Sequence, residues 1–115
     1  MPRRDPGVTI LQMRDHAREA LAMAKGRRRA DLDSDRMFNL ALVRLLEVLG
    51  EAASRVPPEA RRLYAQVPWS ELIGLRNRLI HAYDQVDAEI LWQIVTQDLP
   101  GLVTELEKIA RQEPG

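Results

Sequence analysis

Apolar residues recur along almost the whole chain at the three-to-four-residue spacing of an α-helix. The first such segment begins at Asp5-Pro6, a capping residue followed by a proline at the first helical position, and it ends at Gly26. No segment has the alternating pattern of a half-buried strand. The sequence therefore predicts an all-α fold, an antiparallel bundle of about four main helices plus a short helix.

Capping and helix-breaking residues set the other boundaries, because proline cannot continue a helix and Asp or Ser readily caps one. The predicted segments are a second helix from a cap at Asp33 or Ser34 to about Arg55, a short helix from Pro57-Pro58 to about Tyr64, a third main helix from Trp69 or Ser70, and a last helix capped by Asp87. Pro100 lies inside the last helix and should kink it, because it removes a backbone hydrogen bond.

The second predicted helix is apolar around most of its circumference. Its polar side is a narrow stripe that includes Arg44, Glu47 and Glu51. A surface helix needs only one apolar stripe, about 100° wide. The excess apolar surface over residues 37–49 is explained either by a subunit interface or by a central position in one bundle, and this feature alone favours neither.

The composition excludes several classes of protein. The 115 residues suit one domain over residues 1–115, and 45% of them are hydrophobic, which is enough for a core. The absence of cysteine removes disulfides, thiolate metal sites and cysteine nucleophiles. No apolar run is long enough to span a membrane and no secretory signal is visible, so we expect a cytoplasmic protein without membrane contact.

Charge is distributed unevenly along the chain. The net charge of zero argues against a protein that coats nucleic acid without specificity. Residues 84–115 hold two basic and seven acidic residues, whereas residues 1–36 hold nine basic and six acidic ones. An anionic substrate would therefore avoid the C-terminal segment and favour the region before it.

Side chains suited to phosphate chemistry are concentrated within residues 74–83. The guanidinium of Arg76 can fork onto two phosphate oxygens, and His81 can exchange protons near neutral pH. Asn77 and Tyr83 can position a substrate by hydrogen bonding. Arg78, in the same run, is a candidate to hold an RNA backbone.

An ideal helix does not bring all of these groups together. Asn77 and His81 are four residues apart and share a face, whereas Arg76 lies about 140° from His81. Arg76 falls on the apolar side, where a charge needs a partner, and Glu47 or Glu51 of the second helix is the candidate. Either Arg76 is a structural ion-pair residue, or the helix unwinds near His81 and the two groups converge.

Metal and cofactor motifs are missing from the sequence. His16 and His81 are far apart, and neither cysteine nor an H-E-x-x-H spacing accompanies them. The chain also has no glycine-rich phosphate loop. We therefore expect no metal and no cofactor.

An ordered set of motifs resembles the HepT-like branch of the HEPN superfamily. Arg76, His81 and Tyr83 match its R-x4-H-x-Y motif, and the resemblance covers roughly residues 5–110. The matching surroundings are Gly50-Glu51-Ala52, Pro68-Trp69, Arg76-Asn77, Tyr83-Asp84-Gln85-Val86-Asp87, Trp92 and Asp98-Leu99-Pro100. The motif alone is a weak signal, but the ordered set is a strong one.

The resemblance implies an all-α, HEPN-like homodimer whose two motif helices meet at the interface. It implies metal-independent cleavage of RNA by the toxin of a type VII toxin-antitoxin system. It also implies a partner encoded nearby, a minimal MntA-like nucleotidyltransferase antitoxin that silences the toxin by AMPylation of Tyr83.

The residues then divide into roles for attack of the ribose 2′-hydroxyl on the adjacent phosphate. His81 would be the general base or acid, and Arg76 would stabilise charge on the phosphate. The substrate-positioning residues are Asn77, Arg78 and Tyr83, and the supporting residues are Glu47 and Glu51.

Two other interpretations belong to different classes of protein. In the first, the chain is a non-catalytic nucleotide-binding or adaptor partner of a nucleotidyltransferase, and Arg76 and His81 bind a nucleotide. In the second, it is a purely structural dimer, which the many polar groups around His81 disfavour.

Overall fold

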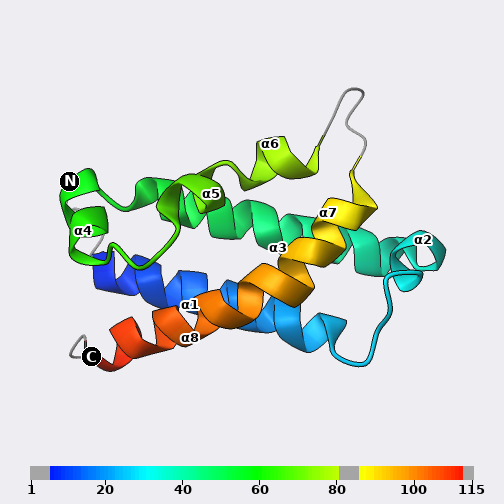
Figure 1. The fold of residues 1–115 in the computed structure, drawn as a ribbon, viewed down its shortest axis with the longest axis horizontal. Coiled ribbons are helices and arrows are strands. Elements are labelled where there is room, and N and C mark those ends of the chain that lie inside the picture. The colour runs from blue at the N-terminus through cyan, green and yellow to red at the C-terminus, as the bar shows by residue number, and fades with distance from the viewer. Residues whose placement is uncertain (1–5, 81–85, 113–115) are drawn as a thin grey trace.

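The computed structural model describes residues 6–80 and 86–112, and these form a helical bundle (Figure 1). The elements in chain order are α1 (Pro6–Ala24), α2 (Asp31–Ser34), α3 (Arg36–Arg55), α4 (Pro58–Leu63), α5 (Trp69–Ile73), α6 (Leu75–Leu79), α7 (Ala88–Gln93), the π-helical turn η2 (Ile94–Asp98) and α8 (Leu99–Gln112). The predicted all-α fold is confirmed. The described ranges contain no strand. An isolated antiparallel β-bridge joins Ile80 and Val86.

Helix α3 is the centre of the bundle. Figure 1 shows α3 antiparallel to α1, and it contacts α1 along one side and α5 and α6 along another. Of the two explanations for its wide apolar surface, the central position accounts for most of it. Met37 and Leu40 remain outside this packing, with 82% and 50% of their surface exposed.

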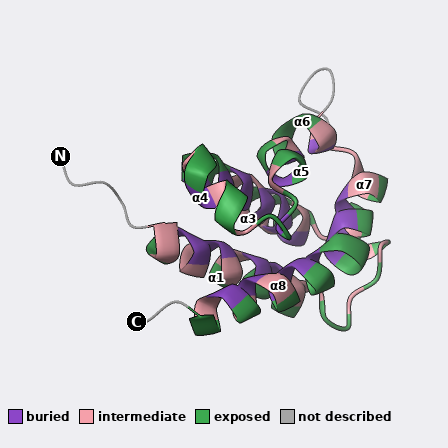
Figure 2. Cartoon of the chain, turned by 60° about the vertical axis from the view of Figure 1, so that its left-hand side comes forward, coloured by how far each residue is buried: buried purple, intermediate pink, exposed green. Residues whose placement is uncertain are grey.

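The core is aliphatic and draws on every main helix. Figure 2 shows the buried positions of α1, α3 and α8 facing one another. A fully buried Leu or Ile side chain contributes roughly 1.5–3 kcal/mol relative to an exposed one. The largest fully buried side chains include Ile10, Met13, Leu42, Leu46, Leu49, Leu79, Leu91, Ile94, Leu99, Leu106 and Ile109.

Helix α8 completes the bundle by packing on α1. It runs antiparallel to α1, so the last helix of the chain covers the first (Figure 1). Arg18 of α1 forms an ion pair with Glu107 of α8 across this contact. The hydrogen bond from Arg18 lowers the pKa of the Glu107 carboxyl. No helix in the described ranges is long and apolar enough to cross a membrane.

The N-cap of α3 is Asp35, so the predicted cap at Asp33 or Ser34 is wrong. Those two residues belong to the separate short helix α2, and the backbone becomes extended only at Asp35. The Asp35 carboxylate accepts hydrogen bonds from the backbone N–H of Phe38 at 3.1 Å and from Arg27 at 2.8 Å. The Arg27 hydrogen bond, followed by that of Phe38, lowers the pKa of Asp35.

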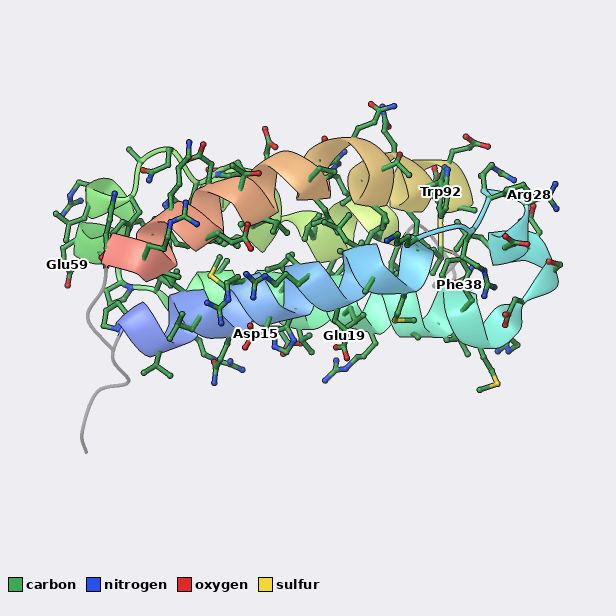
Figure 3. All side chains as sticks on the ribbon, turned by 90° about the horizontal axis from the view of Figure 1, so that it is seen from below. Asp15, Glu19, Arg28, Phe38, Glu59 and Trp92 are labelled. Carbon is green, nitrogen blue, oxygen red and sulfur yellow. The ribbon has the colours of Figure 1, made fainter. Side chains whose placement is uncertain are left out.

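Arg27 also covers an aromatic ring at this end of the bundle. Its guanidinium lies 4.1 Å from the centroid of the Phe38 ring. Figure 3 shows Phe38 and Trp92 at the same end as Arg28. Arg27 therefore stabilises the connection between α1 and α3, in addition to the Asp35 cap.

The third predicted helix is two short helices, α5 and α6, that meet at Gly74. Glycine is a weak helix former, and the backbone at Gly74 departs from helical geometry. Helix α6 ends at Leu79 and Ile80 is extended, because Ile80 pairs with Val86 and the N–H of Asp87 bonds to the Leu79 carbonyl at 2.9 Å. The third predicted helix is therefore interrupted at Gly74 and ends before His81, near which unwinding was one of the two alternatives.

The last helical segment is disturbed one turn before Pro100. The N–H of Leu99 bonds to the carbonyl of Ile94, five residues back, which widens the helix into the π turn η2. Pro100 then occupies the first turn of α8, where a missing N–H costs little. The irregularity expected at the proline thus appears as a π turn preceding it.

Gly50 allows α5 to approach α3 closely. A Cβ atom built on Gly50 would lie 2.6 Å from the backbone oxygen of Leu72, a distance that real Cβ atoms do not tolerate. Gly50 is also buried, so α5 cannot shift without opening the core. The short side chain therefore fixes the distance between α3 and the α5–α6 pair.

We predict that Gly50→Ala destabilises the fold by about 1–3 kcal/mol, because its methyl group forces α5 away from α3. Denaturant unfolding measures the change. Gly101→Ala is the matched control: it lies in α8 with no atom near the added methyl, and should stabilise by about 0.5–1 kcal/mol. Equal unfolding free energies for wild type and Gly50→Ala would contradict this account of the α3–α5 contact.

Candidate active site

Arg76 lies at the edge of the bundle and is held there by α3. Its Nε atom is 3.4 Å from a carboxylate oxygen of Glu47. The Arg76 side chain is 67% exposed, whereas that of Glu47 is 20% exposed. The predicted partner is confirmed, but the expected burial of Arg76 is wrong. Only Leu75 and Leu79 of this five-residue helix are buried, so Arg76 is left at the surface.

Glu51, the other predicted partner of Arg76, pairs with different residues. Its carboxylate lies 3.8 Å from Arg44 and 3.9 Å from Arg55, both on α3. The two acidic residues of the polar stripe therefore have separate partners. Glu47 faces α6, and Glu51 remains among the charges of its own helix.

A cavity of about 160 Å³ opens beside the Arg76–Glu47 pair. It is lined by Glu47, Gly50, Glu51, Ser54, Ile73 and Arg76, and so lies between α3 and the α5–α6 pair. A guanidinium that is exposed at the mouth of a cavity and oriented by a carboxylate can still offer N–H donors to a phosphate. The close approach at Gly50 brings the two walls of this cavity together.

Arg78 does not share the Arg76 site. Its guanidinium lies 3.7 Å from a carboxylate oxygen of Asp98 in η2, and it borders a different, largely apolar pocket. Arg76 faces α3 and Arg78 faces η2, as expected for two residues about 200° apart on a helix. Asn77, between them, is exposed.

Sequence reasoning did not find Asp98 as the partner of Arg78. The residue was visible in the Asp98-Leu99-Pro100 match to the family pattern, but nothing in that pattern linked it to Arg78. The π turn places this carboxylate near α6, and a regular helix pattern does not predict such a turn.

His81 and Tyr83 lie outside the described residues, so their predicted roles stay predictions. The structure describes the residues on either side. Ile80 and Val86 pair with each other, and the carboxylate of Asp87 accepts a hydrogen bond from the N–H of Ile90 at 3.0 Å. The predicted cap of the last helix at Asp87 is thereby confirmed. Because Ile80 and Val86 pair, the two ends of segment 81–85 lie next to each other, one turn beyond Arg76.

His16 borders a second cavity between α1 and α3, with Arg44 and Arg55. Among the residues that the structure describes, no group of three His, Cys, Asp or Glu side chains is arranged to hold a metal ion. The described part of the site is thus an arginine–carboxylate pair next to a cavity, and segment 81–85, whose sequence holds His81 and Tyr83, follows in the chain.

The chain is similar in sequence to a family of known proteins. Residues 13–109 match the family described as "Ribonuclease HepT-like". The chain is 38% identical over 81 residues to "Probable ribonuclease HepT" of Thermococcus cleftensis, covering 70% of this chain and 74% of that protein. It is 33% identical over 107 residues to "Putative RNase MJ1380" of Methanocaldococcus jannaschii, covering 93% of this chain and 98% of that one. No solved structure matches the chain. The matched region spans α3, α5 and α6, and the chain therefore belongs to the HepT-like ribonuclease family.

Proposed function

We propose that this protein is the toxin of a type VII toxin-antitoxin system, an endoribonuclease that cleaves RNA without a metal ion at Arg76 and His81. Membership of the HepT-like ribonuclease family supports the ribonuclease activity. The proposal that the active site lies here rests on one observation. The guanidinium of Arg76 is exposed beside a cavity and is oriented by the less exposed Glu47.

The proposed reaction is attack of the ribose 2′-hydroxyl on the adjacent phosphorus. A bond forms between the 2′ oxygen and phosphorus, and the bond from phosphorus to the 5′ oxygen of the next nucleotide breaks. His81 takes the 2′-hydroxyl proton as general base, and a second His81 protonates the leaving oxygen. Arg76 donates to the non-bridging oxygens, where negative charge grows in the transition state.

We propose a homodimer as the active form, because it supplies that second His81. A single face of α3 carries, in order along the helix, Leu40, Arg44, Glu47, Glu51 and Ser54. The apolar Met37 and Leu40 lie at the start of this exposed side. A contact between copies over these two residues would adjoin the charged half of the face and leave that half open to RNA.

We predict that purified protein cleaves single-stranded RNA in the presence of EDTA, and that His81→Ala lowers the rate by about 10²–10⁴-fold through loss of acid–base catalysis. Gel analysis of a labelled RNA measures the rate. Circular dichroism and the unfolding midpoint of His81→Ala should match wild type. Wild-type rates from the variant would sink the assignment to this motif, and loss of wild-type activity in EDTA would contradict the metal-free mechanism.

Glu47 is a positioning residue in this scheme, because it acts through Arg76. Glu47→Gln should lower kcat on the order of tenfold, since Arg76 loses the charge that orients it. KM should change little because Arg76 still attracts phosphate. Glu47→Asp should restore part of kcat, whereas Glu105→Gln, which removes a surface carboxylate paired with Lys108, should leave both constants unchanged. Parallel loss of stability in Glu47→Gln and Glu47→Asp, with no split between kcat and KM, would indicate a purely structural role.

We further propose that an MntA-like nucleotidyltransferase silences the enzyme by AMPylation of Tyr83. An attached AMP adds negative charge and bulk next to the groups that must bind RNA phosphate. Co-expression with this partner should add one or more AMP units, detected by intact mass, and suppress RNA cleavage. Tyr83→Phe should abolish both effects. Tyr64→Phe, at the other tyrosine in the chain, is the control and should still be modified.

A further inference from the structure

A cavity of about 400 Å³ lies on the other side of Glu51 from the Arg76 cavity. Its polar lining comes from two helices: Gln12, Asp15 and His16 of α1, and Arg44, Glu51 and Arg55 of α3. Figure 3 shows Asp15 on the edge of α1 that runs beside α3. Glu51 lines both cavities, so this groove adjoins the candidate active site.

Two arginines converge in the middle of this groove. Arg44 and Arg55 are eleven residues apart on α3, about 16 Å along the helix axis. Both nevertheless reach Glu51, with guanidinium nitrogens 3.8 Å and 3.9 Å from its carboxylate. Both side chains are more than half exposed, and exposed ion pairs of this length are weak. They can therefore turn to a ligand that offers better geometry.

The charge of the groove favours an anion. Asp15 is already paired, because Arg14 donates to its carboxylate at 3.0 Å. With Arg14 counted, three arginines face the two carboxylates of Asp15 and Glu51 at this groove. His16 adds a further polar group and has no hydrogen-bond or ion-pair partner within residues 6–80 and 86–112. Each guanidinium can form a bidentate pair with phosphate oxygens. The single carboxylate of Glu51 cannot form such a pair with both arginines at once.

We propose that this groove binds a backbone phosphate of the same RNA strand whose cleavage we assign to Arg76 and His81. The inference rests on the proposed function for its choice of ligand. A strand that passes from one cavity to the other passes the Glu51 carboxylate, which lines both. Because that carboxylate repels phosphate, one phosphate lies on each side of it. The preferred substrate is therefore longer than a dinucleotide.

Binding of RNA that cannot be cleaved tests the groove independently of catalysis. Fluorescence anisotropy with 2′-O-methyl RNA of two and of ten nucleotides compares wild type with Arg44→Gln/Arg55→Gln. The double variant should bind the ten-nucleotide RNA roughly tenfold more weakly, and its salt slope should fall by about 0.7 because the contact with one phosphate is lost. Affinity for the dinucleotide should not change. Arg62→Gln, which removes an exposed arginine on α4, is the control.

The outcomes separate this inference from the proposed function. If the double variant and Arg62→Gln have the same affinity and salt slope, the groove is not an RNA subsite. If wild type is a dimer in sedimentation velocity without RNA and the double variant is a monomer, the face is a contact between copies and the inference also fails. Full RNA cleavage by His81→Ala would overturn the proposed active site and leave the binding comparison unaffected.

Discussion

The contact between Gly50 and the Leu72 backbone sets the geometry of everything that lies beyond α3. A side chain at this point of α3 would hold α5 away, and α6 follows α5 with only Gly74 between them. The Arg76–Glu47 pair requires α6 to lie against α3, and the small cavity beside that pair is bounded by the same two walls. A residue with no side chain therefore determines where the charged site can form.

The short length of α6 follows from contacts at both of its ends. At its start, Gly74 interrupts the helix, and at its end Ile80 leaves helical geometry to pair with Val86. Arg78 reaches Asp98 on η2, so α6 is fixed to the last helical segment as well as to α3. These contacts lie at the two ends of segment 81–85, whose sequence holds His81 and Tyr83.

The helical period of the sequence predicted the long helices well, because α1, α3 and α8 each bury one continuous apolar side. It predicted Glu47 or Glu51 as the partner of Arg76, since a charge on that side of the helix needs an opposite charge, and the structure selects Glu47. It failed where the chain departs from ideal geometry. The break at Gly74, the end of α6 at the Ile80–Val86 pairing and the π turn before Pro100 are local departures from regular helix geometry, which a helical wheel assumes throughout.

The placement of α8 over α1 also bears on the order in which the bundle forms. Contacts of α1 with α3, and of α3 with α5 and α6, join segments that are near one another in sequence, so they close at a small entropic cost. The α1–α8 contact, with its Arg18–Glu107 pair, joins the two ends of the domain and can form only after the last helix has left the ribosome. During synthesis, the apolar side of α1 that α8 later covers is open to water or to a chaperone. Truncation within α8 would expose that side permanently, and such a product would be a substrate for proteolysis rather than a smaller folded protein.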